Sequence, residues 1–288
     1  MQRAVGVIGG SGLYEIEGLT DLEEVHLSTP FGEPSDAFLV GRLGEQSVVF
    51  LSRHGRGHRV PPSAINFRAN VWGMKQLGVE RIVSVSAVGS LREELAPGDF
   101  VFVDQFFDRT RHRVDTFFDR DVVAHVMLAD PVCEDVRKTL FATAGDLGVT
   151  LHDGGTYVNM EGPQFSTRAE SKVYRSWGMD VIGMTNLQEA KLAREAELCY
   201  ATVAMVTDYD CWRQDEEDVT VEAILEVMRA NVGHARRLIA SVVPLLGGER
   251  GCPCKDALRY AIMTAPERIP DEARTRLGLL IDPYLPNA

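Results

Sequence analysis

The chain has 288 residues, 45% of them hydrophobic and 25% charged, which is ordinary for a globular protein that buries a sizeable core. Its net charge of −12 disfavours nucleic-acid partners, because an acidic surface repels their phosphates. No apolar run is long enough to span a membrane, and the first residues, MQRAVGVIGGSG, lack the pattern of a secretion signal, so we expect a cytoplasmic protein without a membrane partner.

Short apolar runs recur along the chain and predict strands that are covered on both faces of a sheet. These runs lie at 5–8, 48–51, 82–88, 100–103, 181–184 and 201–206. Helical patterns lie between or after them at 64–77, 187–198 and 219–246, and the sequence TRAE at 167–170 has the spacing of a capping box that opens another helix. Strands that alternate with helices predict an α/β fold, a single three-layer domain over residues 1–246 with a central mixed sheet flanked by helices.

Residues 247–288 have a different character. The sequence GGERGCPC ends the long helical pattern, and a short amphipathic helix is expected around 270–277. We predict that this tail packs on the main domain or on a neighbouring subunit. Cys252 and Cys254 flank a proline in it, and three interpretations stay open: a strained redox-active pair, two reduced thiols, or half of an intersubunit metal site. Two cysteines are too few for a structural zinc ion, so no metal site is predicted.

Polar side chains end several of the predicted strands. The turn after the first strand holds a serine, the second strand ends in an arginine and a histidine, and two others end in hydroxyl residues: Ser11, Arg53, His54, Ser86 and Thr185. Ligands of open α/β sheets bind beyond the carboxyl ends of the strands. Hydroxyl, guanidinium and imidazole groups that converge there suit a phosphate ion.

Two neighbouring features carry less weight. The GGSG turn matches neither a Walker A loop nor the dinucleotide fingerprint, and a plain strand-to-helix turn explains it equally well. In the loop RHGRGHR, His58 and Arg59 are interpreted as solvated residues, because basic loops usually face water.

Asp208 and Asp210 follow the last predicted strand, on either side of Tyr209. Alternate residues of an extended segment point the same way, so both carboxylates are expected to face one pocket. A metal site would need further ligands that the neighbouring sequence lacks, and a role as turn residues explains the pair about equally well. The functional hypothesis is that they hydrogen-bond a heterocycle, one of them with a raised pKa that lets it donate a proton.

Six segments, taken together, resemble the trimeric purine nucleoside phosphorylase family, and most of all its 5′-methylthioadenosine phosphorylase branch. In chain order they are GVIGGSGL, SRHGRGH, NFRANVWGMKQLG, SAVGSLREELAPGDFVFVDQFFDRT, EGPQFSTRAES and IGMTNLQEAKLAREAELCYATVAMVTDYDCW. The resemblance implies a pentosyltransferase of purine and methionine salvage that converts S-methyl-5′-thioadenosine and phosphate to adenine and 5-methylthioribose 1-phosphate. Inorganic phosphate would be a co-substrate, with no metal or organic cofactor. The family also implies a homo-oligomer, a trimer or a dimer of trimers.

Residue by residue, the resemblance implies three groups of contacts. Phosphate would be held by Ser11, Arg53, His54, Ser86, the Ala87 backbone and Thr185. The nucleoside would meet Phe165 at the base, Met184 at the ribose, Asp208 at purine N7 and Asp210 at the 6-amino group. The 5′ pocket would be formed by Ser166, Val221, Ile224 and Leu225, together with His125 of a neighbouring subunit. Asp208, as general acid, and His54 would be the catalytic residues.

Related activities stay open as alternatives: phosphorolysis of adenosine, or of the 6-oxopurine nucleosides inosine and guanosine. The aspartate pair favours a 6-aminopurine, and the apolar 5′ lining favours a methylthio group over a hydroxyl. The sequence departs from the family pattern at Asn186, which is expected to adjust contacts to the ribose or the base. A nucleoside hydrolase and a non-catalytic nucleoside-binding protein are disfavoured, because neither needs a separate phosphate site.

Overall fold

Eleven strands of the described chain form one mixed sheet. The computed structural model describes residues 3–10, 12–213 and 221–286, without the side chains of 221–224. The strands are β1 (Ala4–Gly9), β2 (Leu19–Val25), β3 (Phe38–Leu43), β4 (Gln46–Ser52), β5 (Val79–Ser90), β6 (Phe100–Phe102), β7 (Gln105–Asp108), β8 (Leu151–Asp153), β9 (Thr156–Asn159), β10 (Val181–Gly183) and β11 (Cys199–Asp208). Their order is β2-β3-β4-β1-β5-β10-β9-β7, and β11 pairs with β5 and with β6, which also pairs with β8. The predicted α/β fold with a mixed sheet is confirmed.

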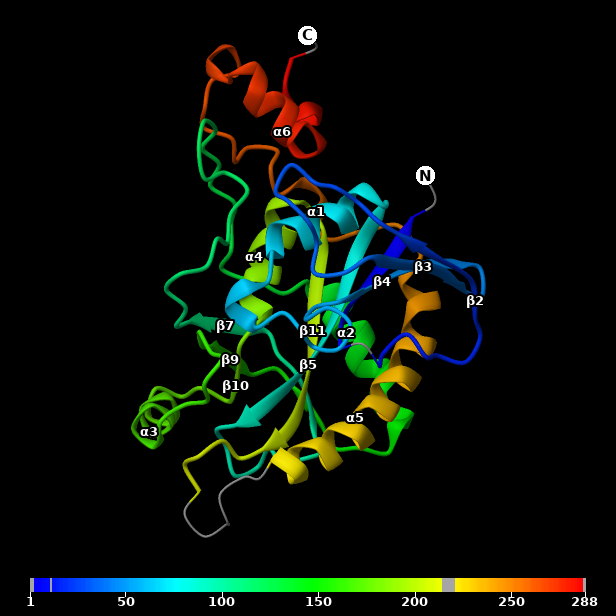
Figure 1. Cartoon of the computed structure of the whole chain (residues 1–288), viewed down its shortest axis with the longest axis vertical. Coiled ribbons are helices and arrows are strands. Elements are labelled where there is room, and N and C mark those ends of the chain that lie inside the picture. The colour runs from blue at the N-terminus through cyan, green and yellow to red at the C-terminus, as the bar shows by residue number, and fades with distance from the viewer. Residues whose placement is uncertain (1–2, 11, 214–220, 287–288) are drawn as a thin grey trace.

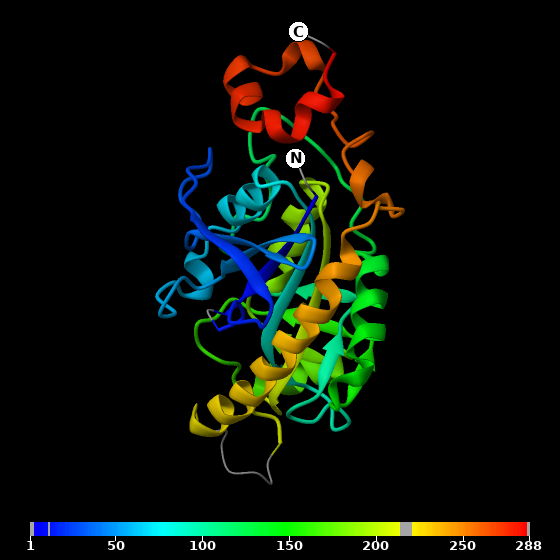
Figure 2. The same ribbon diagram turned by 90° about the vertical axis from the view of Figure 1, so that its right-hand side faces the viewer.

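Helices cover both faces of this sheet (Figures 1 and 2). The helices α1 (Phe67–Gln76) and α4 (Asn186–Glu195) pack together on one face, and α2 (Glu134–Thr143) and α5 (Val221–Val242) on the other. The helix α3 (Arg168–Ser176) begins after Thr167, which forms the predicted capping box with Glu170. All six predicted strands are present. Those not predicted, β2, β3, β7, β8 and β9, lie away from the buried centre or are only three or four residues long.

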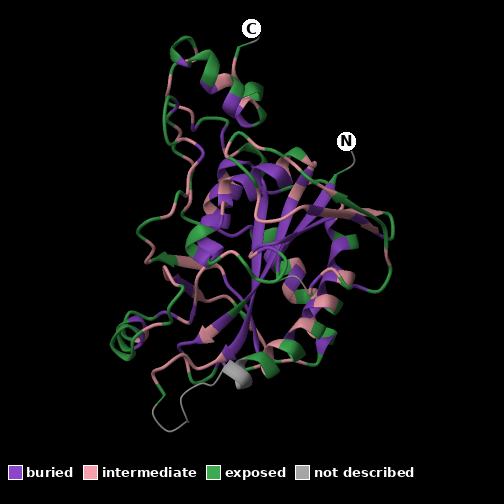
Figure 3. Ribbon diagram, viewed as in Figure 1, coloured by how far each residue is buried: buried purple, intermediate pink, exposed green. Residues whose placement is uncertain are grey.

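Successive residues of the central strands face opposite cores. In β11, Ala201 and Val203 pack in the core shared with α2 and α5, whereas Tyr200 packs in the core shared with α1 and α4. In β1, Val7 packs in the core shared with α2 and α5, and Ile8 packs in the core shared with α1 and α4. Figure 3 shows these strands buried along most of their length. Because both faces are covered, the strands are apolar at nearly every position, which explains their continuous apolar runs.

Parallel pairing brings the carboxyl ends of four strands to one edge. The pairs β4–β1, β1–β5 and β5–β11 are all parallel. Strand β10 runs antiparallel to the end of β5, with Ile182 opposite Gly89. Continuing that register brings Thr185 level with Ser86. Four of the strand-end residues singled out in the sequence, Arg53, His54, Ser86 and Thr185, therefore gather at the edge where ligands of such sheets bind.

The described part of the tail, residues 247–286, packs on its own chain. Leu258, Leu277 and Ile281 belong to the core that contains α1 and α4. The helix α6 (Asp271–Ile281) lies at one end of the molecule, near the C-terminus (Figure 1). The Glu197 carboxylate anchors the segment by accepting hydrogen bonds from the Leu258 N–H (2.9 Å) and the Tyr284 hydroxyl (2.6 Å). Within the described ranges, no helix combines the length and apolarity needed to cross a membrane.

Candidate active site

A cavity of about 650 Å³ lies at the carboxyl edge of the sheet. Its wall includes most of the residues that the sequence assigns to phosphate and nucleoside: Arg53, His54, Ser86, Ala87, Phe165, Met184, Thr185, Asp208 and Asp210. They come from β5 and β11 and from the segments that follow β4, β9 and β10. A cavity of this size accommodates a small organic ligand.

Three predicted residues fall outside what the structure describes. Ser11 is one of them, although Gly10 and Gly12 on either side both line the cavity. Val221 and Ile224 lie in the first turns of α5, and their side chains are outside the described part of the chain. Their contacts stay predictions.

Two further predicted residues do not line the cavity. Ser166 is not among the residues that line the cavity, although its hydroxyl lies 3.7 Å from Sδ of Met160, which does line it. Leu225 lies on α5 one turn before Met228, and its side chain is 39% exposed. Met228 does line the cavity, so α5 contributes a residue one turn after the predicted Leu225.

His125 does not line this cavity. It lines a second cavity, of about 700 Å³, together with tail residues such as Tyr260. Its backbone N–H donates to the Ala261 carbonyl at 2.9 Å, which ties the segment to the tail. His125 is therefore not part of the site formed by the chain that carries it.

The main cavity has two chemically different ends. In the pairing of β5 with β11, Ala204 lies opposite Ser86 and Asp208 opposite Gly89. Three residue steps separate Ser86 from Gly89, which places the two levels about 10 Å apart along the strand. The Arg53 guanidinium is at the Ser86 level, since its Nη1 donates to the neighbouring Val85 carbonyl at 3.1 Å. Hydrogen-bond donors gather at one end and carboxylates at the other.

Arg53 is held rigidly by buried partners. Its side chain is only 3% exposed and forms a two-armed ion pair with Glu189, through Nε and Nη2. Nη2 also donates to Ser84 Oγ at 2.6 Å. Burial disfavours the charge, but Glu189 outweighs this effect and raises the pKa of Arg53. One Nη1 hydrogen has no acceptor among the described residues, so it is available to a ligand in the cavity.

His54 is a neutral imidazole at pH 7. Burial, with a contribution from the Arg53 charge, lowers its pKa to about 4. Its Nδ1 lies 2.8 Å from the Val60 carbonyl, which can only accept, so Nδ1 carries the hydrogen and Nε2 the lone pair. The His58 ring stacks on His54 with ring centres 4.2 Å apart. His58 and Arg59 are exposed, but both line the cavity, so their interpretation as merely solvated residues was incomplete.

The helix α4 begins at the donor-rich end. Thr185 is its N-cap residue, and the Thr185 side chain makes no capping hydrogen bond. The unpaired amides of a first helical turn and the positive end of the helix dipole both favour an anion. The Ser86 hydroxyl is also buried without a hydrogen-bond partner among the described residues. This end of the cavity can therefore bind an anion through neutral donors as well as through Arg53.

Asp208 and Asp210 form the other end. Asp208 accepts hydrogen bonds from the Thr207 hydroxyl (2.7 Å) and the Asp210 N–H (2.8 Å). Burial nevertheless raises the pKa of Asp208. Burial also raises the pKa of Asp210, and the Asp208 charge adds to that effect. For both carboxyl groups burial is the largest cause of the raised pKa, and repulsion between the two charges contributes only at Asp210.

The Thr207 hydroxyl suits either protonation state of Asp208. It lies 2.7 Å from Asp208 Oδ2 and 3.1 Å from the Val88 carbonyl, and it has one hydrogen to donate. When Asp208 is ionised, Thr207 donates to it. When Asp208 is protonated, the acid can donate to Thr207, which then donates to Val88. The site accommodates a change of protonation without losing the contact to Asp208.

Asn186 does not line the cavity, so any adjustment it makes to contacts with the ribose or the base is indirect. It is fully buried, and its Nδ2 lies within 2.9 Å of the hydroxyl oxygens of Ser84, Tyr200 and Thr202. As the first residue of α4, it turns its side chain into the core behind Arg53. Its role is to brace the network that holds Arg53.

Arg113 is a positioning residue that no sequence pattern revealed. Its guanidinium pairs with the Glu161 carboxylate (3.1 Å) and donates to the Met184 carbonyl and to Gln188 Oε1. These bonds hold the segment after β9 against Met184. The fit is close, because a Cβ on Gly162 would lie 2.5 Å from Met184 Sδ. Arg113 stands in a basic run, RHR, whose spacing gives no sign of burial.

The helix α5 supports the opposite wall. Met228 and Val232, four residues apart, line the cavity. One turn further on, Arg236 Nε donates to the Gly12 carbonyl at 2.7 Å, and Nη2 pairs with Glu15 at 2.6 Å. Arg236 therefore fixes the glycine-rich turn that borders the donor-rich end.

Several known proteins are similar to this chain in sequence and in fold. The S-methyl-5′-thioadenosine phosphorylase of Geobacter sulfurreducens is 56% identical over 286 residues, covering 99% of this chain and 100% of its own. The crystal structure of a methylthioadenosine phosphorylase from an Antarctic soil metagenomic library has a TM-score of 0.93 at 46% identity, covering 97% of this chain and 99% of its own. The methylthioadenosine phosphorylase of Schistosoma mansoni, solved in complex with adenine, has a TM-score of 0.82 at 38% identity over 90% and 99% of the two chains.

A profile of the family described as the phosphorylase superfamily matches residues 4–244. The match spans β1 to the end of α5 and so includes every described residue of the cavity wall. This chain belongs to the phosphorylase superfamily.

Proposed function

We propose that the protein is a pentosyltransferase that cleaves 5′-methylthioadenosine with phosphate, releasing adenine and 5-methylthioribose 1-phosphate. One observation carries the proposal: a single cavity has anion donors at one end and two half-buried carboxylates at the other. The separation of about 10 Å between these levels leaves room for a ribose between a phosphate and a purine. The relatives described above are phosphorylases of this nucleoside, which supports the choice of substrate.

Phosphate binds at the donor-rich end in this proposal. Its contacts are the free Nη1 hydrogen of Arg53, the hydroxyls of Ser86 and Thr185, and the start of α4. The Ser11 hydroxyl and the Ala87 backbone complete the predicted set. His54, being neutral, accepts a hydrogen bond from a protonated phosphate oxygen at Nε2. Phosphate held there lies beside the ribose and stabilises the positive charge that develops on the sugar.

The purine leaves from the acidic end. Asp208 donates a proton to N7, which makes the base a better leaving group, and its raised pKa suits this role. Asp210 accepts a hydrogen bond from the 6-amino group and thereby selects adenine over a 6-oxopurine. Phe165 lines the cavity with a ring that is 70% exposed, and a stacked base would cover that surface. The charges involved come from phosphate and side chains, so the reaction needs no metal or organic cofactor.

The active enzyme is a homo-oligomer in this proposal, with a trimer as its unit. His125 would complete the 5′ pocket of a neighbouring subunit. Support comes from exposed apolar side chains near it: Met127 is 82% and Tyr260 86% exposed. Such side chains are usual where subunits meet. Light scattering coupled to size-exclusion chromatography tests the assembly, and a monomer would contradict it.

Purine release from 5′-methylthioadenosine, adenosine and inosine, each with and without phosphate, tests the function. The expected result is phosphate-dependent release of adenine, fastest from 5′-methylthioadenosine. Faster release from adenosine would move the protein to a general adenosine phosphorylase, and faster release from inosine would overturn the role of Asp210. Release without phosphate would make the enzyme a hydrolase.

Arg236→Met is expected to raise the KM for phosphate about tenfold, with a smaller change in kcat. The substitution removes the bond that fixes the Gly12 carbonyl beside the phosphate end. Steady-state kinetics at varied phosphate concentration measure the effect. Arg237→Met is the matched control, because Arg237 lies on the same helix but donates to the Leu147 carbonyl at 3.1 Å. Equal changes in both variants would show that the Gly12 bond has no specific role.

A further inference from the structure

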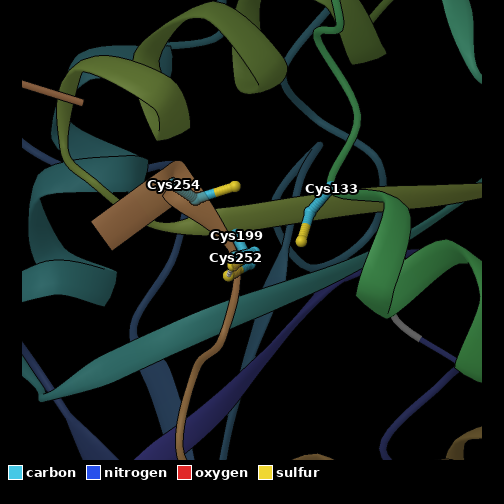
Figure 4. Close-up of side chains that lie close together, drawn as sticks. All are labelled: Cys133, Cys199, Cys252 and Cys254. Carbon is cyan, nitrogen blue, oxygen red and sulfur yellow. Dashed lines mark hydrogen bonds between the residues drawn. The ribbon is translucent and has the colours of Figure 1, made fainter. Parts of the chain in front are cut away.

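Four of the five cysteines converge far from the cavity described above. Cys133 precedes α2, Cys199 opens β11, and Cys252 and Cys254 flank Pro253 at the start of the tail. Each is at most 9% exposed. Their sulfur atoms all lie within 4.8 Å of one another, and Figure 4 shows them gathered around a common space. The sequence suggested only Cys252 and Cys254 as a pair, because nothing local connects them to Cys133 and Cys199.

The distances suit one central ion better than two disulfides. A disulfide requires sulfurs about 2.05 Å apart. Here all four cysteines are free, and the sulfurs of Cys199 and Cys252 are 3.3 Å apart. A tetrahedral ion with metal–sulfur bonds of about 2.3 Å places its four sulfurs about 3.8 Å apart. Each sulfur has the other three as neighbours, which is the arrangement of a single centre rather than of two separate pairs.

We propose that Cys133, Cys199, Cys252 and Cys254 bind one structural zinc ion. Four thiolates and no oxygen ligand select a soft or borderline metal, and zinc with four cysteines is a common structural site. Four protein ligands leave no coordination position open for a substrate, so the ion has no part in catalysis.

The surroundings fit a charged centre of this kind. A zinc ion with four thiolates carries two negative charges, which are costly to bury without positive charge nearby. Arg194 lines the same cavity as three of the cysteines, and its guanidinium is held there by the carbonyls of Met127 (2.9 Å) and Asp130 (2.7 Å). That cavity also gives an ion a route to the buried sulfurs.

The proposed ion ties the tail to the sheet. Cys199 and Asp208 lie at opposite ends of β11, about 30 Å apart along the strand. Removing the ion is therefore expected to affect the stability of the fold before the chemistry. Other anchors act nearby: Arg81 donates to the carbonyls of Leu246 and Gly248, each at 2.9 Å. The ion would fix the chain a few residues after these bonds.

Elemental analysis of the full-length protein, purified without chelator, tests the proposal. About one zinc ion per chain is expected, together with a fall of roughly 10 °C in Tm when the ion is removed by a chelator. Cobalt added to the metal-free protein should give the intense visible bands of a tetrahedral thiolate site. Cys252→Ser and Cys254→Ser should lose the zinc. Cys211→Ser is the matched control and should keep it, because the Cys211 thiol contacts the Ser166 carbonyl and not the cluster.

Mass spectrometry after alkylation in denaturant decides the main alternatives. Four alkylated cluster cysteines together with bound zinc support the proposal. Zinc absent and the cluster cysteines paired as disulfides would overturn it, as would four free thiols without any metal. Iron in place of zinc would overturn the choice of ion.

Discussion

Asp208→Asn is expected to lower kcat for 5′-methylthioadenosine by about two to four orders of magnitude, the usual contribution of a general acid. Asparagine can hydrogen-bond purine N7 but cannot transfer a proton to it. KM should change less, because the shape and the hydrogen bonds of the side chain are kept. Asn Oδ1 still accepts from the Asp210 N–H, and Nδ2 can donate to the Thr207 hydroxyl.

The same substitution is expected not to lower stability at pH 7, and to raise it slightly. Burial raises the pKa of Asp208, so the folded state favours the neutral carboxyl more than the unfolded state does. The carboxyl therefore stabilises the fold below its unfolded pKa, and this contribution is lost as the pH rises through the folded pKa. Asparagine stays neutral at every pH, so the variant does not lose this contribution. Its free energy of unfolding should therefore exceed that of the wild type near pH 7 and equal it at pH 3.

Thermal unfolding at both pH values and steady-state kinetics measure the two effects together. The exposed Asp146, in the turn after α2, provides the matched control, Asp146→Asn, which should change neither quantity. In the wild type, kcat/KM should fall as the pH rises through the Asp208 pKa, because the acid must carry its proton. Full activity of Asp208→Asn would assign the proton to another group.

The residues that could be predicted from the sequence are those that directly follow apolar runs. Arg53, Ser86 and Asp208 stand at or near the carboxyl ends of parallel strands, and such ends share one edge of a sheet. That rule brings these three together without any knowledge of the exact strand order, whereas Thr185 reaches the same edge because β10 runs antiparallel to the end of β5. The family resemblance adds the role of each residue, which position alone does not specify.

The supporting residues could not be predicted, because their partners are far away in the sequence. Glu189 pairs with Arg53 across 136 positions, and Arg113 reaches Gln188 across 75. From the sequence alone, Glu189 looks like an ordinary solvated residue, because it stands in a helix rich in Ala, Leu, Glu and Lys. The buried contacts of Asn186 could not be predicted for a related reason: its position beside Thr185 suggested an influence on the ligand, but the start of α4 turns its side chain inward. Such contacts depend on the packing of α4 against the sheet.

Arg53→Met is expected to destabilise the protein by about 3–5 kcal/mol, because it leaves the buried Glu189 carboxylate without its cation. Phosphate-dependent activity should fall as well, by about 100- to 1000-fold, through loss of a donor at the phosphate. The single variant cannot separate these effects, since a loosened fold also lowers activity.

The double variant Arg53→Met with Glu189→Gln separates them. Glutamine removes the unpaired charge and still accepts hydrogen bonds from the hydroxyls of Ser84 and Tyr200, which lie 2.8 and 2.9 Å from Glu189 Oε2. Most of the lost stability should return, as measured by chemical denaturation, while activity stays low. Recovery of activity along with stability would show that Arg53 serves only as the partner of Glu189.

Glu189→Gln alone should change the KM for phosphate in the direction opposite to Arg53→Met. In the wild type the Glu189 carboxylate pairs with Arg53 and so offsets part of the positive charge that Arg53 presents to an anion. Removing that carboxylate leaves the guanidinium charge free to attract the anion, at the cost of some stability from an unpaired buried charge. The KM for phosphate should fall in Glu189→Gln and rise in Arg53→Met. If both variants raised it equally, the pair would act only by shaping the cavity, and the charge of Arg53 would have no direct part in binding phosphate.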